Sequence, residues 1–140
     1  MLVIRPDCTL YSYNWVTMSE ADYHNDPGRD ISDASIGLTC RIYGQAPVQA
    51  AGRVNRHPFY FRARHAAWEF TVSVSHDIDA AAIWPRDDKQ GFFVMDEYRG
   101  YFLCGDYRDG EEASFMRYSK VEEIIRACIQ RFLNEDTGLL

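Results

Sequence analysis

The clearest pattern in the chain is an alternation of hydrophobic and polar side chains in its middle third. Residues 38–43 and 48–54 both alternate with a period of two. Such a period predicts strands that bury one face and expose the other. The Gly and Pro residues within 44–47, and the sequence NRHP at 55–58, predict turns at the ends of these strands. The pattern therefore indicates consecutive antiparallel strands joined by short turns.

The stretch HPFYFRARHAAWEF continues this pattern and predicts a β-hairpin. We expect strands at 59–64 and 68–75, with Arg64 opposite Glu69 and a four-residue loop at 65–68. This register places apolar residues opposite one another, whereas a slip by one residue sets apolar against polar positions. A two-residue turn of alanines is disfavoured, because alanine resists the positive φ that such a turn requires.

Weaker patterns predict the elements on either side. Residues 2–18 alternate in part and favour one or two strands. Residues 19–35 carry five acids and a Pro-Gly break, which is typical of an exposed and mobile acidic loop. Further along, 92–95 and 101–107 predict two more strands, with Gly100 supplying the permissive turn between them.

The C-terminal segment has the strongest helical pattern. Ser119 followed by Glu122 forms a capping box, which predicts a helix that begins there. Hydrophobic residues then recur at helical spacing, at Val121, Ile124, Ile125, Cys128 and Phe132. Strands followed by one amphipathic helix predict an α+β fold, an antiparallel meander sheet of about five to seven strands with the helix packed on one face. We expect the core to include Phe59, Phe61, Phe70, Val72, Ile124, Ile125 and Phe132.

Composition narrows the classes of protein. The 140 residues fit a single domain, 1–140, and 46% of them are hydrophobic, which is enough to build a core. A formal net charge of −6 argues against a nucleic acid or an anionic membrane surface as partner. The four cysteines are scattered without a CxxC pair, and the sequence has no signal peptide pattern and no apolar run long enough for a transmembrane helix. We therefore expect an acidic, soluble, cytoplasmic protein with reduced thiols.

Arginine is the residue type that most suggests a binding site. Arg62 and Arg64 are expected on one face of the hairpin with Tyr60, and Arg53 and Arg41 on neighbouring strands with the same orientation. One interpretation is a basic, partly aromatic patch that binds a carboxylate, a phosphate or an acidic protein. The other is a solvated sheet face with a weak cross-strand ion pair. We favour the solvated face and keep Arg62, Arg64, Tyr60 and Arg53 as the candidate ligand-binding residues.

Catalytic and metal-binding motifs do not stand out. The histidines and cysteines lack the close spacing of a zinc site, and His76 and Asp77 point to opposite faces of an extended segment. Asp77 is more simply the cap of a short helical turn. No nucleophile elbow, P-loop or dinucleotide motif is found in the sequence. Cys104 is the thiol least readily given a structural role, and a histidine from anywhere in the fold could complete a dyad with it, so the enzyme alternative places Cys104, His76 or His65 near a pocket. We predict no metal and no cofactor, and we assign no catalytic residue.

These observations favour a non-catalytic binding domain whose target is a protein or a small ligand. A small acidic protein that neutralises a basic partner, as bacterial immunity proteins do, is one version by analogy. One alternative is a small enzyme of unknown reaction that uses Cys104 or a histidine in a pocket. Another is a structural or assembly subunit, such as a homodimer through exposed sheet edges. A deep pocket holding His or Cys favours the enzyme, whereas a flat apolar patch favours a protein partner.

Overall fold

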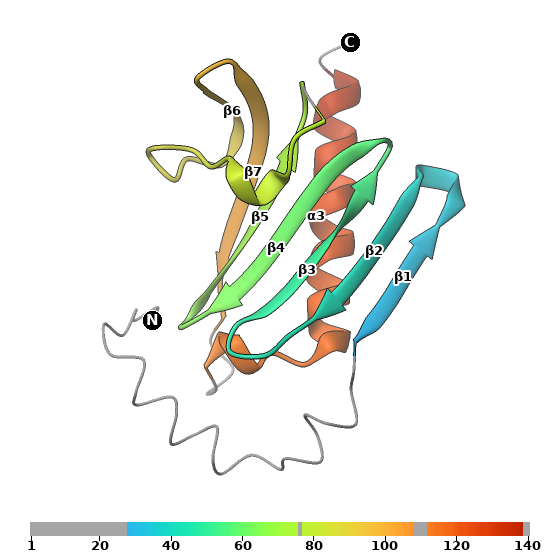
Figure 1. Ribbon diagram of the computed structural model, residues 1–140, viewed down its shortest axis with the longest axis vertical. Helices are drawn as coiled ribbons and strands as arrows, with labels where there is room; N and C mark the ends of the chain where they lie inside the picture. Colours follow the sequence, from blue (N-terminus) through green and yellow to red (C-terminus); the bar gives the residue numbers. More distant parts are fainter. Residues whose placement is uncertain (1–27, 76, 108–111, 139–140) are drawn as a thin grey trace.

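The computed structural model describes residues 28–75, 77–107 and 112–138. These residues form a seven-stranded antiparallel sheet with one long helix, α3, on one face (Figure 1). The elements are β1 (Arg29–Asp33), β2 (Leu38–Tyr43), β3 (Val48–Val54), β4 (His57–Arg64), β5 (Ala67–Ser73), β6 (Gly91–Met95), β7 (Tyr98–Asp106) and α3 (Tyr118–Gly138). Short 3₁₀ turns lie at η1 (Ala34–Ile36), η2 (Ala80–Ala82) and η3 (Ala113–Phe115). The predicted α+β class, with an antiparallel sheet and a C-terminal helix packed on it, is confirmed.

The sheet follows chain order from β1 to β5 and then changes. Its order is β1-β2-β3-β4-β5-β7-β6, so the last hairpin places β7 beside β5 and leaves β6 at the edge. The connection after β5 contains η2 and carries the chain over the face opposite α3 (Figure 1). In the described part of the chain, β1 and β6 are therefore the two edge strands.

The core lies between the sheet and α3. Alternate residues of each strand point toward the helix, and one face of the helix meets them. All the predicted core residues belong to it: Phe59, Phe61, Phe70, Val72, Ile125 and Phe132 are buried, and Ile124 is partly buried against them. Near the C-terminal end of α3, the hydroxyl of Tyr101 on β7 donates a hydrogen bond to Glu135. This contact fastens the far end of the helix to the sheet.

The hairpin of β4 and β5 differs from its predicted register by two residues. Arg62, and not Arg64, lies opposite Glu69, and the turn contains His65 and Ala66 rather than four residues. The prediction was wrong because it considered only alanines at a two-residue turn, whereas His65 takes the positive φ of 58°. A shift of two residues keeps every side chain on its predicted face, so the hydrophobic pattern does not distinguish the two registers.

A buried carboxylate holds this turn in place. Glu112, whose side chain is only 2% exposed, accepts a hydrogen bond from the backbone N–H of His65. The backbone N–H of Ala113 donates to the carbonyl of His65, and that of Tyr107 donates to the carbonyl of Ala66 at 2.9 Å. The chain on both sides of residues 108–111 thus closes the end of the hairpin.

The acidic loop predicted at 19–35 is wrong in its second half. There the chain forms β1, in which Ile31 is buried between two exposed polar neighbours, and then η1. A single apolar residue among charges is too weak a pattern to indicate a strand. The first half of that loop and the strands predicted at 2–18 lie outside the described residues.

The turn between β6 and β7 also differs from its prediction. It is made at Asp96, which takes a φ of 56°, whereas Gly100 lies inside β7. A Cβ atom at residue 100 would lie 2.4 Å from Cζ of Phe93 on β6. The glycine is therefore required by the ring that packs over it, and not by a turn.

Two helix caps are shifted from their predicted positions. The carbonyl of Arg117 accepts from the N–H of residue 121, so α3 begins at Tyr118 and Ser119 lies inside its first turn instead of capping it. The cap of η2 is Asp79, because its carboxylate accepts from the N–H of residue 81 at 2.9 Å. Asp77 has another role, described below.

A smaller hydrophobic cluster forms on the face opposite α3. There η2 and the residues after it pack on β4 and β5, and both Ile83 and Phe102 are buried. Phe93 and Ile83 meet over Gly100. This cover reaches only part of the face, and the polar side chains of β2, β3 and β4 beyond it remain partly or fully exposed.

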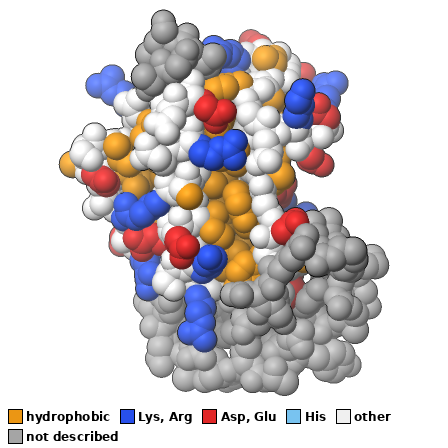
Figure 2. Space-filling model, turned by 180° about the vertical axis from the view of Figure 1, so that it is seen from behind, with side chains coloured by type: hydrophobic (Ala, Val, Ile, Leu, Met, Phe, Trp, Pro, Cys, Tyr) orange, Lys and Arg blue, Asp and Glu red, His pale blue; other side chains and the backbone are white. Residues whose placement is uncertain are grey.

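The helix side carries some partly exposed hydrophobic surface. Seen from that side, hydrophobic side chains form a vertical strip flanked by charged and other polar positions (Figure 2). The partly buried residues that pack against the core include Ile124 and Leu133 of α3, Trp68 of β5 and Phe92 of β6. Apolar surface on this side therefore extends to the edge strand β6.

Candidate functional site

The predicted ligand-binding residues lie on the open sheet face, and two of them are neighbours. Tyr60 and Arg62 both point outward from β4. The hydroxyl of Tyr60 donates to Oε1 of Gln49 at 2.6 Å, and Nη2 of Arg62 donates to Oε1 of Glu69 at 3.0 Å. The Nε atom of Arg62 is buried and has no hydrogen-bond partner among the described residues. These contacts form a short polar row across β3, β4 and β5.

The other arginines stand apart from this row. Arg53 lies opposite Pro58, four positions along β4 from Arg62, which corresponds to roughly 13 Å. It binds Asp77 at 2.6 Å, which is the role that the structure gives to this acid. Arg64 is exposed next to the turn. The structure therefore brings Tyr60 and Arg62 together and leaves Arg53 and Arg64 at separate places.

The positive charges on this face are largely neutralised within the chain. Arg41 binds Asp30 at 2.9 Å, and Arg53 and Arg62 have the acidic partners just described. Exposed ion pairs of this kind contribute at most about 1 kcal/mol each, and they leave little net charge to attract an anion. Ligand binding by the four arginine and tyrosine candidates stays a prediction, with the geometry closer to that of a solvated face.

Tyr43 and Tyr60 lie on this face as neutral groups that can form hydrogen bonds. Burial raises the pKa of Tyr60, and the nearby Arg62 only partly opposes this effect. Burial also raises the pKa of Tyr43, and Asp79 adds to it. Both phenols thus keep their protons at neutral pH and offer aromatic surface with a polar tip.

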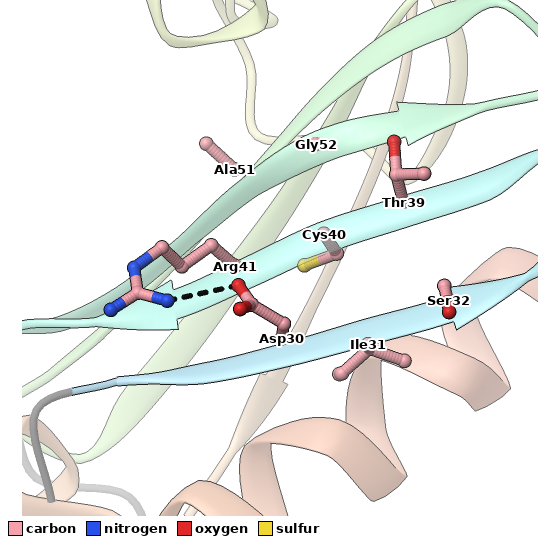
Figure 3. Close-up of a pocket in the computed structure, with 8 residues that line it drawn as sticks. All are labelled: Asp30, Ile31, Ser32, Thr39, Cys40, Arg41, Ala51 and Gly52. Atoms are coloured by element: carbon pink, nitrogen blue, oxygen red, sulfur yellow. Dashed lines mark hydrogen bonds and ion pairs between the residues drawn. The ribbon is translucent and has the colours of Figure 1, made fainter.

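An open hollow of about 360 Å³ lies over β1, β2 and β3 (Figure 3). Its lining residues are Asp30, Ile31, Ser32, Thr39, Cys40, Arg41, Ala51 and Gly52. The ion pair of Arg41 and Asp30 spans one side of it, as the dashed line in Figure 3 shows. Burial raises the pKa of Cys40 to about 12, so this thiol is protonated at neutral pH and is a poor nucleophile. The hollow has small side chains and an internal ion pair, and it lacks a set of polar groups that converge on a ligand.

Of the three residues considered for catalysis, the structure describes Cys104 and His65. Burial raises the pKa of Cys104, and Asp88, Glu69 and Asp106 raise it further, so its thiol stays protonated. Nδ1 of His65 lies 3.7 Å from Oε1 of Glu112, the buried carboxylate at the turn between β4 and β5. This contact belongs to the turn of the hairpin. The described residues contain no group of three or more His, Cys, Asp or Glu side chains that could hold a metal ion. His76 lies outside the described residues.

The sequence interpretation missed two exposed hydrophobic residues. Trp84, just after η2, is 56% exposed, and Val94 in the middle of β6 is 67% exposed. They lie on different faces of the sheet, because Val94 shares a face of β6 with Phe92, which packs on Phe132 of α3, whereas Trp84 follows Ile83 on the face opposite α3. The exposure of Trp84 could have been predicted, because this tryptophan is followed by the polar sequence PRDDKQ. Val94 gave no such signal, since its exposure depends on β6 being an edge strand.

Comparisons with known proteins do not identify a function for this chain. No protein-family model, curated protein or solved structure matches this chain. Within the residues that the structure covers, no helix has the length and hydrophobicity to cross a membrane. A proposed function therefore rests on the exposed side chains of Trp84 and Val94, the neutralised arginine face and the protonated thiols.

Proposed function

We propose that this chain is a non-catalytic protein-binding domain, and that its contact surface is the β6 edge with Trp84 and Val94. The observation that carries the proposal is the exposure of these two side chains, 56% and 67%, on the two faces of the sheet beside β6, whereas the other large hydrophobic residues that the structure describes are buried or partly buried. Exposed apolar surface of this kind marks places where proteins meet. Tryptophan is also among the residues that contribute most to binding when a partner covers them.

Within the described residues no thiol has a lowered pKa, which supports binding over catalysis. Acids and burial keep Cys104 protonated, and the hollow beside Arg41 has its charge paired within the chain. An enzyme that uses Cys104 is the second candidate. Replacing Cys104 with serine removes the nucleophile of such an enzyme, whereas binding at β6 stays as it is.

The cellular setting is part of the same proposal. We place the domain in the cytoplasm, because Cys40, Cys104 and Cys128 carry free thiols among the described residues. The net charge of −6 disfavours nucleic acid and an anionic membrane as targets. A protein is therefore the partner we expect.

A comparison of surface variants tests the proposal. The tagged chain captures partners from a soluble cell extract, and each captured protein is then purified and titrated against the chain by calorimetry. The variant Trp84→Ser/Val94→Lys should bind at least about tenfold more weakly than the parent. The control Arg62→Gln/Arg64→Gln changes the other face and should bind like the parent. Binding that is lost with the arginine variant and kept with the β6 variant would refute the assignment of the surface.

A further inference from the structure

We propose that residues 112–118, which lead from β7 into α3, form a clasp that makes the β2–β3 turn and the β4–β5 turn open and close as one unit. The clasp contains η3 and ends at the first residue of α3. The two turns, at 44–47 and 65–66, lie at the same end of the sheet, because Val48 pairs with Ala63 directly beside them. The clasp thus lies at the end of the sheet where both hairpins turn (Figure 1).

The β4–β5 turn is bound to the clasp through both backbone groups of one residue. The N–H of His65 donates to Oε1 of Glu112, and the carbonyl of His65 accepts from the N–H of Ala113. His65 has a φ of 58°, in the left-handed region that residues other than glycine adopt at a cost. Such a conformation persists where its surroundings hold it, and here the clasp supplies both hydrogen bonds.

The β2–β3 turn is bound to the same clasp. The N–H of Ala46, whose φ is 49°, donates to the carbonyl of Ser114 at 3.1 Å. The hydroxyl of Tyr118 donates to the carbonyl of Gly44 at 2.8 Å. Both turns therefore contain a residue other than glycine with a positive φ, and in both turns the N–H of that residue is bound by the clasp.

Glu112 and Ser114 connect the two sets of contacts inside the clasp. Each carboxylate oxygen of Glu112 accepts from one backbone N–H, Oε1 from that of His65 and Oε2 from that of Ser114 at 2.9 Å. The carbonyl of Ser114 in turn accepts from the N–H of Ala46. A chain of hydrogen bonds thus runs from one hairpin turn to the other through these two residues of the clasp.

Burial makes it costly to break this chain of hydrogen bonds at a single point. The side chain of Glu112 is 2% exposed, and Ser114 is 7% exposed. A buried carboxylate that loses one of its donors keeps the cost of its burial without the bond that offsets it. Water reaches the freed groups once the clasp moves away from the sheet, and that movement breaks the contacts to both turns. Opening both turns together therefore costs less than the sum of two separate openings.

The opposite end of the sheet provides a matched control. There Asp33 caps η1 by accepting from the N–H of Ser35 at 3.0 Å, as Glu112 caps η3. The carbonyl of Ile36 in η1 accepts from the N–H of Asn55 in the β3–β4 turn at 3.1 Å. Both 3₁₀ turns thus have an acidic cap and a bond to a hairpin turn. Among the described contacts, those of η1 reach one hairpin turn and those of the clasp reach two.

Amide hydrogen exchange, measured by NMR on the full chain, tests the inference residue by residue. In the parent, the amides of Ala46 and His65 should have the same protection factor to within about threefold, because they open in the same event. Phe61, in the middle of β4, should be protected at least about tenfold more strongly, because its amide is exposed only when the whole sheet opens.

Two substitutions in the clasp separate joint opening from the local loss of a bond. Glu112→Gln replaces one acceptor oxygen of the buried carboxylate with a donor, and should speed exchange at Ala46 and His65 by one factor, at least about tenfold. The N–H of Ala46 is bonded to Ser114 and not to Glu112, so a purely local effect would leave exchange at Ala46 unchanged. Tyr118→Phe removes a bond to the β2–β3 turn alone and should still speed exchange at both turns by one factor. It carries the test if Glu112→Gln does not fold.

Asp33→Asn makes the same acid-to-amide change at the cap of η1. It should speed exchange at Asn55 in the β3–β4 turn and leave Ala46 and His65 unchanged. Unequal responses of the two clasped turns to either clasp variant would show that the turns open separately. Protection at both turns equal to that at the centre of β4 would show that they open only with the whole sheet. Either result overturns the inference.

Discussion

Replacing Phe61 with alanine tests the assignment of the two sheet faces most directly. Phe61 lies in the middle of β4, opposite Ala50 on one side and Phe70 on the other, and its side chain is 0% exposed. Its ring stacks on Trp68 with centroids 6.2 Å apart. The substitution therefore removes a ring from the centre of the core, where sheet and helix enclose it on all sides.

The expected loss follows from two contributions. Returning the buried ring to water costs about 2 kcal/mol, from its share of the buried apolar surface. The cavity that remains adds a similar amount, because central strands with neighbours on both sides relax only in part. We therefore expect a loss of about 3 to 5 kcal/mol in the free energy of unfolding, which lowers the melting temperature by roughly 10 to 15 °C for a domain of this size.

Urea unfolding followed by far-UV circular dichroism measures this loss. Arg64→Ala serves as the matched control, because Arg64 lies on the same strand, points to the other face and is exposed. It should change the free energy of unfolding by less than about 0.5 kcal/mol. If Phe61→Ala costs less than about 1 kcal/mol, or if the two substitutions cost the same, the assignment of faces is wrong.

Three further predictions concern other parts of the molecule. Arg62→Gln/Arg64→Gln should change stability by less than about 1 kcal/mol, and a melting temperature that sulfate raises well above the effect of chloride at matched ionic strength would instead indicate an anion site. Gly52→Ala should destabilise the protein by about 1 to 3 kcal/mol in thermal unfolding, because its Cβ would lie 2.1 Å from a backbone oxygen of β2, and an unchanged melting temperature would contradict this. Burial raises the pKa of Cys40 and of Cys128 from 9.0 to about 12, so the unfolded chain ionises first as the pH rises. The contribution of the two buried thiols to the free energy of unfolding should be fully present below pH 9.0 and should be lost between pH 9.0 and about 12. The Cys40→Ala variant should show a shallower decrease over this range. Urea unfolding at a series of pH values measures both curves.

The orientation of side chains was predictable, but the pairing of strands was less so. A period of two is a property of the sequence, so Phe59 and Phe61 could be placed on the core face before the fold was known. The register of β4 and β5 depends on a distant contact instead, since Glu112 binds the N–H of His65 at the turn. No local pattern contains a partner that lies 47 positions away in the chain.

The candidate site shows the same limit. The sequence indicated that Tyr60, Arg62 and Arg64 share one face, and the structure agrees. It did not indicate which acids pair with the arginines, because Asp77 reaches Arg53 from the connection that crosses the sheet. The exposure of Val94 depends on strand order, which the alternation of side chains does not specify.

Because β7 lies between β5 and β6 in the sheet, β5 must wait for a later part of the chain before both of its edges are paired. β5 is complete by residue 73, but its permanent neighbour begins only at Tyr98, and the helix that covers the core begins at Tyr118. On the ribosome, at about 5 to 20 residues per second, β5 thus waits a few seconds for its second partner. Until α3 follows, Phe70 and Val72 also lie on a sheet face that no helix covers. The backbone edge of β5 is therefore paired only after β7 has followed it out of the ribosome, and the apolar face of the sheet is covered only after α3 has followed as well.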